Sequence, residues 1–152
     1  MKILILDPEK KVNHRISKDT SGGYGTGNDF GDAIIPTFLK KTLKMVHDWA
    51  PMFAVYTMSV LKKKGHEVYY SKKLPKNPSS FDLYIVVSSI VCCETECENI
   101  KIISKFNKKA LVIGPFSTSN PKKYIEAGGT VIMEEPEFFF MKKKNLDAIE
   151  NN

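Results

Sequence analysis

Residues 2–7 have the sequence Lys-Ile-Leu-Ile-Leu-Asp, a short apolar run without polar alternation. Such a run is typical of a parallel strand that is buried on both faces of a sheet. Further strands are expected after it, alternating with helices, at residues 67–71, 82–88, 110–114 and 130–134. Strands that alternate with helices through right-handed crossovers define an α/β fold. We therefore expect a flavodoxin-like, Rossmann-like three-layer domain with a five-stranded parallel sheet in the order 2-1-3-4-5.

Proline, glycine and capping residues indicate where the helices begin and end. A helix is expected between Pro51 and Gly65, because proline suits a first helical turn and glycine suits the position just after a helix. Thr95-x-x-Glu98 has the pattern of a capping box, which predicts a second helix from about Glu96. Two short helices are expected after Asn120-Pro121 and from Pro136.

Composition and charge exclude several classes of protein. The 152 residues fit one domain, and 42% hydrophobic with 26% charged residues is the balance of an ordinary globular protein. No apolar run approaches the roughly 18 residues of a membrane span, and the N-terminus lacks the features of a signal peptide. We expect a cytoplasmic protein without a membrane partner. The net charge of +6 comes from scattered lysines with a single arginine, Arg15, so no nucleic-acid partner is expected.

Two connections depart from an ideal doubly wound domain. Residues 72–81 are too few and too rich in proline for a crossover helix, which leaves part of one sheet face bare. Residues 8–50 form a long insertion where a loop of about two to six residues is usual. Within it, residues 36–49 have helical apolar spacing, and we expect this helix to cover the bare region. The domain is assigned to residues 1–144, with a flexible tail at 145–152.

A ligand site is expected at one edge of the sheet. In open α/β sheets, ligands bind beyond the carboxyl ends of the strands, where the chain order reverses. For the order 2-1-3, Asp7–Gly31 and Ser88–Glu94 should border that point. The insertion there contains Ser21-Gly22-Gly23-Tyr24-Gly25-Thr26-Gly27, whose backbone N–H groups can face a phosphate. The run matches neither a Walker P-loop nor a complete G-x-G-x-x-G, and a flexible loop without a ligand is the alternative.

Three cysteines lie at or just beyond the end of the strand at 82–88: Cys92, Cys93 and Cys97. Without a signal peptide they indicate a reducing compartment rather than a disulfide framework. Cys93-x3-Cys97 resembles the start of the C-x3-C-x2-C loop of radical S-adenosylmethionine enzymes, but Ile100 occupies the third position. No iron–sulfur cluster is therefore expected in this chain. A redox or adventitious metal site and buried, incidental thiols are the two alternatives.

Several stretches, taken in order, follow the pattern of one known family. They are the opening strand with Asp7-Pro8, Ala50-Pro51-Met52 ahead of Gly65-His66-Glu67-Val68, Asp82 to Ser89, Val112 to Ser117, and Glu134 to Phe138. Together they resemble the N-terminal cobalamin-binding-like domain of radical S-adenosylmethionine enzymes, over nearly the whole chain. The resemblance implies a cobalamin-binding accessory domain, with a radical S-adenosylmethionine catalytic domain as its partner.

The resemblance also implies a set of cofactor contacts: Asp7, Gly22, Gly23, Gly25, Gly27, Ser88, Ser89, Gly114 and Ser117. Classical members carry a D-x-H-x-x-G loop whose histidine binds cobalt, but here Glu9 replaces the histidine and Val12 the glycine. Cobalamin bound without a protein ligand below the cobalt, and loss of cobalamin, both stay open. The chain shows no catalytic constellation, so it is at most one domain of an enzyme.

Two functions of other classes stay open beside this one. The first is a flavodoxin-like module that holds a flavin or a nucleotide phosphate in the glycine-rich loop. The second is a cofactor-free interaction domain, whose partner covers the sheet face that lacks a helix. A phospho-receiver domain does not fit, because Ser88-Ser89 stands where the acceptor aspartate belongs and Glu134-Glu135 where the lysine belongs.

Overall fold

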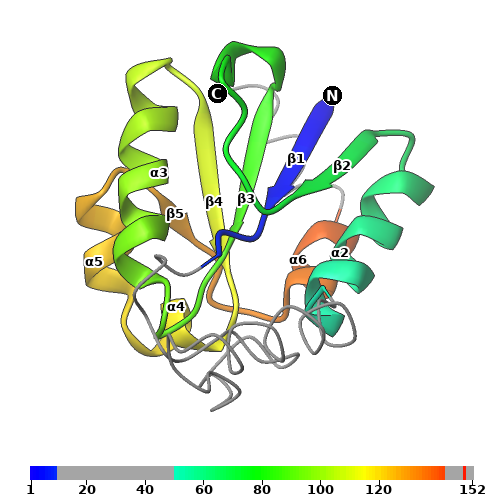
Figure 1. The fold of residues 1–152 in the computed structure, drawn as a ribbon. Helices are drawn as coiled ribbons and strands as arrows, with labels where there is room; N and C mark the ends of the chain where they lie inside the picture. The colour runs from blue at the N-terminus through cyan, green and yellow to red at the C-terminus, as the bar shows by residue number, and fades with distance from the viewer. Residues whose placement is uncertain (10–49, 143–148, 150–152) are drawn as a thin grey trace, which may run out of the picture.

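The computed structural model describes residues 1–9, 50–142 and 149 of the chain. They form one all-parallel sheet with the strand order β2-β1-β3-β4-β5, and helices pack on both of its faces (Figure 1). The strands are β1 (Lys2–Leu6), β2 (Glu67–Ser71), β3 (Leu83–Val87), β4 (Lys109–Ile113) and β5 (Thr130–Val131). The expected three-layer, flavodoxin-like α/β fold and its strand order are confirmed. The last strand is shorter than expected, because the ladder to β4 ends at Val131.

Successive side chains of each strand point to opposite faces of the sheet, so the core has two layers. Ile3, Ile5 and Ile85 face α2 (Met52–Lys63) and α6 (Pro136–Met141), which contribute Leu61 and Phe140 to the same cluster. On the opposite face, the even-numbered residues of β1 and β3 pack against α3 (Cys93–Lys105) and α5 (Pro121–Glu126). The continuous apolar runs of the sequence are therefore explained by burial of both sheet faces.

Two helices differ from the sequence-based expectation. The helix expected from about Glu96 begins three residues earlier, at Cys93, and the capping box at Thr95 and Glu98 does not define its start. The hydroxyl of Ser89 instead accepts a 3.2 Å hydrogen bond from the Cys92 N–H just before the helix. A short helix that was not expected, α4 (Pro115–Ser119), follows β4. It begins with proline at its first position, a signal that the sequence did contain.

The connection between β2 and β3 carries only a single 3-10 turn at Pro78–Ser80, so the expected lack of a crossover helix is confirmed. Leu74 and Phe81 from this connection pack against the core cluster beneath α3 and α5. The buried Tyr84 hydroxyl donates a 2.7 Å hydrogen bond to the Pro78 carbonyl. The connection therefore covers part of the face that would otherwise be bare, while the helix expected at 36–49 lies outside the described residues.

The chain ends contribute one further contact to the core. Ile149 packs against the core cluster beneath α2 and α6, and its carbonyl accepts a 2.8 Å hydrogen bond from Lys109 Nζ. The other residues of the expected tail at 145–152 lie outside the described part of the chain. Within the described residues, no helix has the length and apolar character that crossing a membrane requires.

Candidate functional site at the carboxyl edge of the sheet

Three neighbouring strands end on polar or glycine residues at one edge of the sheet. Leu6 of β1 lies beside Val86 of β3, and Val86 lies beside Val112 of β4. Counting one or two residues onward from this common row gives Asp7, Ser88 and Gly114. Because the strands are parallel, these residues meet at the carboxyl edge of the sheet. This is the switch point of the fold, because β2 lies on one side of β1 and β3 lies on its other side. This is the place where the sequence predicts a ligand.

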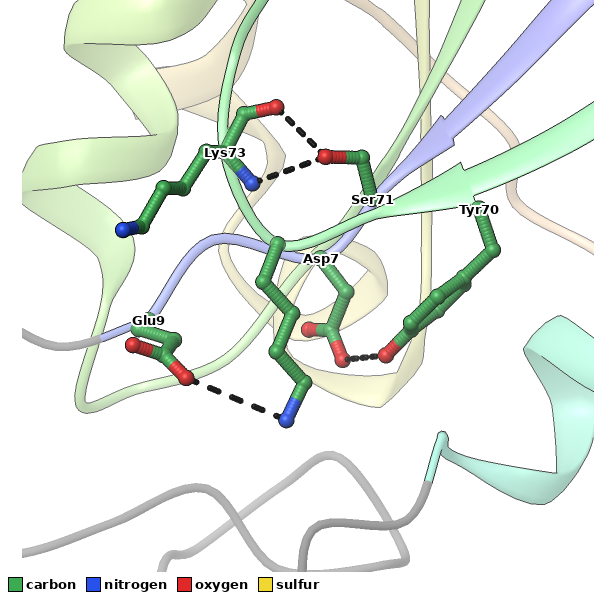
Figure 2. Close-up of polar contacts among 6 residues, drawn as sticks. Asp7, Glu9, Tyr70, Ser71 and Lys73 are labelled. Atoms are coloured by element: carbon green, nitrogen blue, oxygen red, sulfur yellow. Dashed lines mark hydrogen bonds and ion pairs between the residues drawn. The ribbon is translucent and has the colours of Figure 1, made fainter.

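Asp7 is held in a fixed orientation by the neighbouring strand, β2. The Tyr70 hydroxyl donates a 2.6 Å hydrogen bond to Asp7 Oδ2 (Figure 2). The Asp7 N–H donates to the Ser71 carbonyl at 2.9 Å. Burial raises the pKa of Tyr70, and the negative charge of Asp7 raises it further. Tyr70 therefore stays protonated and acts as a donor at every physiological pH. Asp7 is only 5% exposed, so the site contains a buried, oriented carboxylate.

An ion pair between Glu9 and Lys72 lies next to Asp7 (Figure 2). Glu9 Oε1 is 3.9 Å from Lys72 Nζ, which links the residues after β1 to those after β2. The Ser71 hydroxyl donates to the Lys73 carbonyl at 2.7 Å and accepts from the Lys73 N–H at 3.1 Å, and so turns the chain away from the edge (Figure 2). The β1 and β2 ends are thus joined by hydrogen bonds and by an ion pair.

Gly114 occupies a position that accepts no side chain. Its φ is +118°, and a Cβ there would lie 2.8 Å from Ser88 Oγ and 3.2 Å from the ring of Phe53. Glycine adopts this backbone conformation without strain, whereas residues with a Cβ do not. The end of β4 therefore approaches the end of β3 closely, and the Ser88 N–H donates to the Ile113 carbonyl at 2.8 Å.

The structure brings Ser88, Gly114 and Ser117 together into one hydrogen-bonded cluster. The Ser117 N–H donates to Ser88 Oγ at 3.0 Å, and the Ser88 hydroxyl donates to Ser117 Oγ at 3.0 Å. The Ser117 hydroxyl then donates to the Gly114 carbonyl at 3.0 Å. Both serines are fully buried. A ligand that touches these hydroxyls must replace one of these bonds, whereas the Gly114 backbone is partly exposed.

Ser89 lies apart from this cluster, because its polar groups bind a buried glutamate. The Ser89 N–H and hydroxyl donate to the Glu96 carboxylate at 3.1 Å and 2.9 Å. The Tyr124 hydroxyl donates to Glu96 at 2.6 Å, and burial followed by the Glu96 charge raises the pKa of Tyr124. Sequence reasoning missed Glu96, although it shares a helical face with Ile100 and Ile103, both of which are core residues.

The three cysteines lie beside this buried glutamate. Cys92 and Cys93 are buried, and Cys97 Sγ contacts the Lys123 carbonyl at 3.7 Å. Burial, followed by the neighbouring Cys93, raises the pKa of Cys97 to about 12. The thiolate, which is the reactive form of cysteine, is therefore disfavoured at this position. No group of three or more His, Cys, Asp or Glu side chains in the described part of the chain is arranged to hold a metal ion.

The predicted contacts in the glycine-rich loop, Gly22, Gly23, Gly25 and Gly27, lie outside the described residues. Of the other predicted contacts, Asp7, Ser88 and Gly114 follow three adjacent strand ends, Ser117 joins them from α4, and Ser89 faces the α3 and α5 side. Comparison with known proteins gave no match: no protein family, no curated protein and no solved structure matched this chain. Fold and site together define an α/β domain with a candidate ligand site at its switch point.

Proposed function

We propose that this chain is a binding module whose ligand lies across the carboxyl ends of β1, β3 and β4. The observation that supports it most is the convergence of Asp7, Ser88 and Gly114 on the edge where the strand order reverses. In this class of fold, ligands bind in that crevice because loops and strand ends diverge there. The fold alone does not specify a ligand, so the ligand class must come from the residues.

The ligand that we propose is a cobalamin, as the resemblance to the cobalamin-binding-like domain of radical S-adenosylmethionine enzymes implies. Two strand spacings separate β1 from β4, a width of about 9–10 Å, which suits a broad, flat ring. Ser88 and the Phe53 ring already occupy the space that a Cβ at Gly114 would need, so glycine keeps this strand end flat and leaves its partly exposed backbone for a ring to approach. Asp7, oriented by Tyr70, can accept hydrogen bonds from the amide groups of a corrin.

In this proposal the chain holds and presents the cofactor, and a separate radical S-adenosylmethionine domain carries the iron–sulfur cluster. A bound corrin supplies the cobalt on which group-transfer chemistry depends. The contributions of the chain itself are the Asp7 carboxylate, the flat strand end at Gly114 and the exclusion of water by the buried strand ends. None of these requires a nucleophile of its own.

A titration with hydroxocobalamin tests the proposal. The purified chain is mixed with hydroxocobalamin, desalted, and examined for corrin absorbance, with flavin mononucleotide in a parallel sample. We expect retained corrin absorbance near one equivalent and no retained flavin. Retained flavin without corrin would replace the proposal with a flavin-binding module. Retention of neither ligand would contradict a cofactor site at this edge and favour an interaction domain.

A further inference from the structure

Helix α2 is apolar on its outer side as well as on its inner side. Ala54 and Leu61 face the sheet and are buried. Met52, Val55 and Tyr56 follow one another on the opposite side at helical spacing and are 58%, 48% and 51% exposed. An outer helix of a three-layer domain normally turns charged or polar residues to this side. The outer face of α2 therefore has the character of a contact surface.

The neighbouring helix α6 extends this surface. Phe138 and Met141, three residues apart on α6, are 58% and 57% exposed. The two helices lie side by side over the same sheet face (Figure 1), and Lys64 Nζ at the end of α2 donates to the Met141 carbonyl at 2.7 Å. We refer to the five side chains Met52, Val55, Tyr56, Phe138 and Met141 as the α2–α6 patch.

The ends of the α2–α6 patch carry opposite charges. Lys62 and Lys63 lie in the last turn of α2, which contains no acidic residue. Glu135 precedes the first residue of α6, and Glu137 lies in its first turn. The patch thus has an apolar middle, a basic end and an acidic end.

We propose that a second copy of this chain covers the α2–α6 patch, so that the protein forms a two-fold symmetric dimer. In a two-fold interface the same surface meets itself, and every contact occurs twice. An antiparallel arrangement places the basic end of each patch over the acidic end of the other. Lys63 of one copy then faces Glu135 of the second copy, while the apolar side chains meet in the middle.

The size of the patch agrees with a dimer of moderate affinity. Side chains of this kind present about 200 Å² each and are about half exposed here, which gives roughly 500 Å² per copy. A patch of several hundred Å² is at the upper limit for a monomer. Together with the charged ends, two copies bury roughly 1,200 Å², the lower bound of specific interfaces. An assembly of this size dissociates on dilution.

Sedimentation velocity of the full chain over a concentration series tests the proposal. We expect a monomer–dimer equilibrium that reaches mostly dimer at about 100 µM, within the range of small interfaces. Phe138→Ser should shift the midpoint of dimerisation at least about tenfold toward higher concentration. The control is Ile125→Ser on α5 in the opposite layer, a position with the same 58% exposure, which should leave dimerisation unchanged.

Charge-reversal variants test the arrangement itself. Lys63→Glu and Glu135→Lys should each weaken self-association, because each brings like charges together. An equimolar mixture of the two variants should restore it, since both contacts between unlike copies then pair opposite charges. A wild-type chain that stays monomeric at every concentration would overturn the proposal and leave the patch for a different protein. Equal loss in Phe138→Ser and Ile125→Ser would also overturn it.

Discussion

The Tyr124 hydroxyl of α5 donates a 2.6 Å hydrogen bond to the Glu96 carboxylate of α3, and both side chains are fully buried. Ser89, at the end of β3, donates two further hydrogen bonds to the same carboxylate. A buried charge is tolerated only when donors satisfy it. This cluster therefore fixes α3 and α5 relative to the end of β3. Ser88, the residue directly before Ser89, borders the candidate site.

Replacement of Tyr124 by phenylalanine removes one donor from the buried carboxylate. We expect the free energy of unfolding in urea to fall by about 1.5–3 kcal/mol, the usual range for a hydrogen bond to a charged group. Tyr69→Phe is the control, because the Tyr69 hydroxyl makes only a 3.4 Å contact with Glu67 at the surface. That change should stay within about 0.5 kcal/mol. Equal losses in the two variants would show that the hydrogen bond to the buried carboxylate stabilises the fold no more than the contact at the surface.

Stability should decrease in alkaline solution, and Cys97 should begin the decrease. The pKa of Cys97 is raised from 9.0 to about 12, so the folded chain holds this proton more tightly than the unfolded chain. The corresponding stabilisation is complete below pH 9 and is lost as the pH rises toward 12. The urea midpoint should therefore fall between pH 9 and pH 10, and Cys97→Ser should fall less over that interval. A midpoint that is constant or rises, in a chain that contains Cys97, would contradict the assignment.

The connection between β2 and β3 should stabilise the fold in spite of lacking a helix. Phe81 lies edge-to-face with Tyr84, at 5.9 Å between ring centroids, and packs against the core beneath it. Phe81→Ala should lower the free energy of unfolding by about 2–3 kcal/mol, somewhat less than a fully buried phenylalanine. Phe106→Ala, at a residue that is 44% exposed, should cost less than half of this. Equal effects would indicate that the connection does not cover the sheet.

Strand order and helix α2 are predictable from the sequence because each has a local signal. The apolar runs at β1 and β3 are long enough to distinguish buried parallel strands, and Pro51 and Gly65 bound α2 on either side. The predicted start of α3 was wrong, because Ser89 binds both the Cys92 N–H and the Glu96 carboxylate, and these contacts outweigh the local pattern at Thr95 and Glu98. Contacts that form only in the folded chain are not visible in a single sequence.

The candidate site is predictable only in its position. The switch-point rule locates Asp7, Ser88 and Gly114, since it depends on topology alone. It does not reveal that Tyr70 orients Asp7 or that Ser117 occupies the Ser88 hydroxyl, because these pairs are separated by 63 and 29 residues. Ser89 was grouped with Ser88 by adjacency, but successive residues at a strand end point in opposite directions.

The most direct test of a cofactor at the carboxyl edge compares two glycine variants in the hydroxocobalamin titration. Gly114 and Gly128 both have a positive φ, of +118° and +94°, and an added Cβ would approach a serine hydroxyl to 2.8 Å and 2.7 Å respectively. Alanine should therefore strain both positions alike. Gly128, however, lies just before β5, at the amino-terminal ends of the strands and away from the candidate site. The account predicts that Gly128→Ala retains corrin like the wild type, while Gly114→Ala retains it at least about tenfold more weakly. Equal retention in the two variants, or none in the wild type, would contradict it.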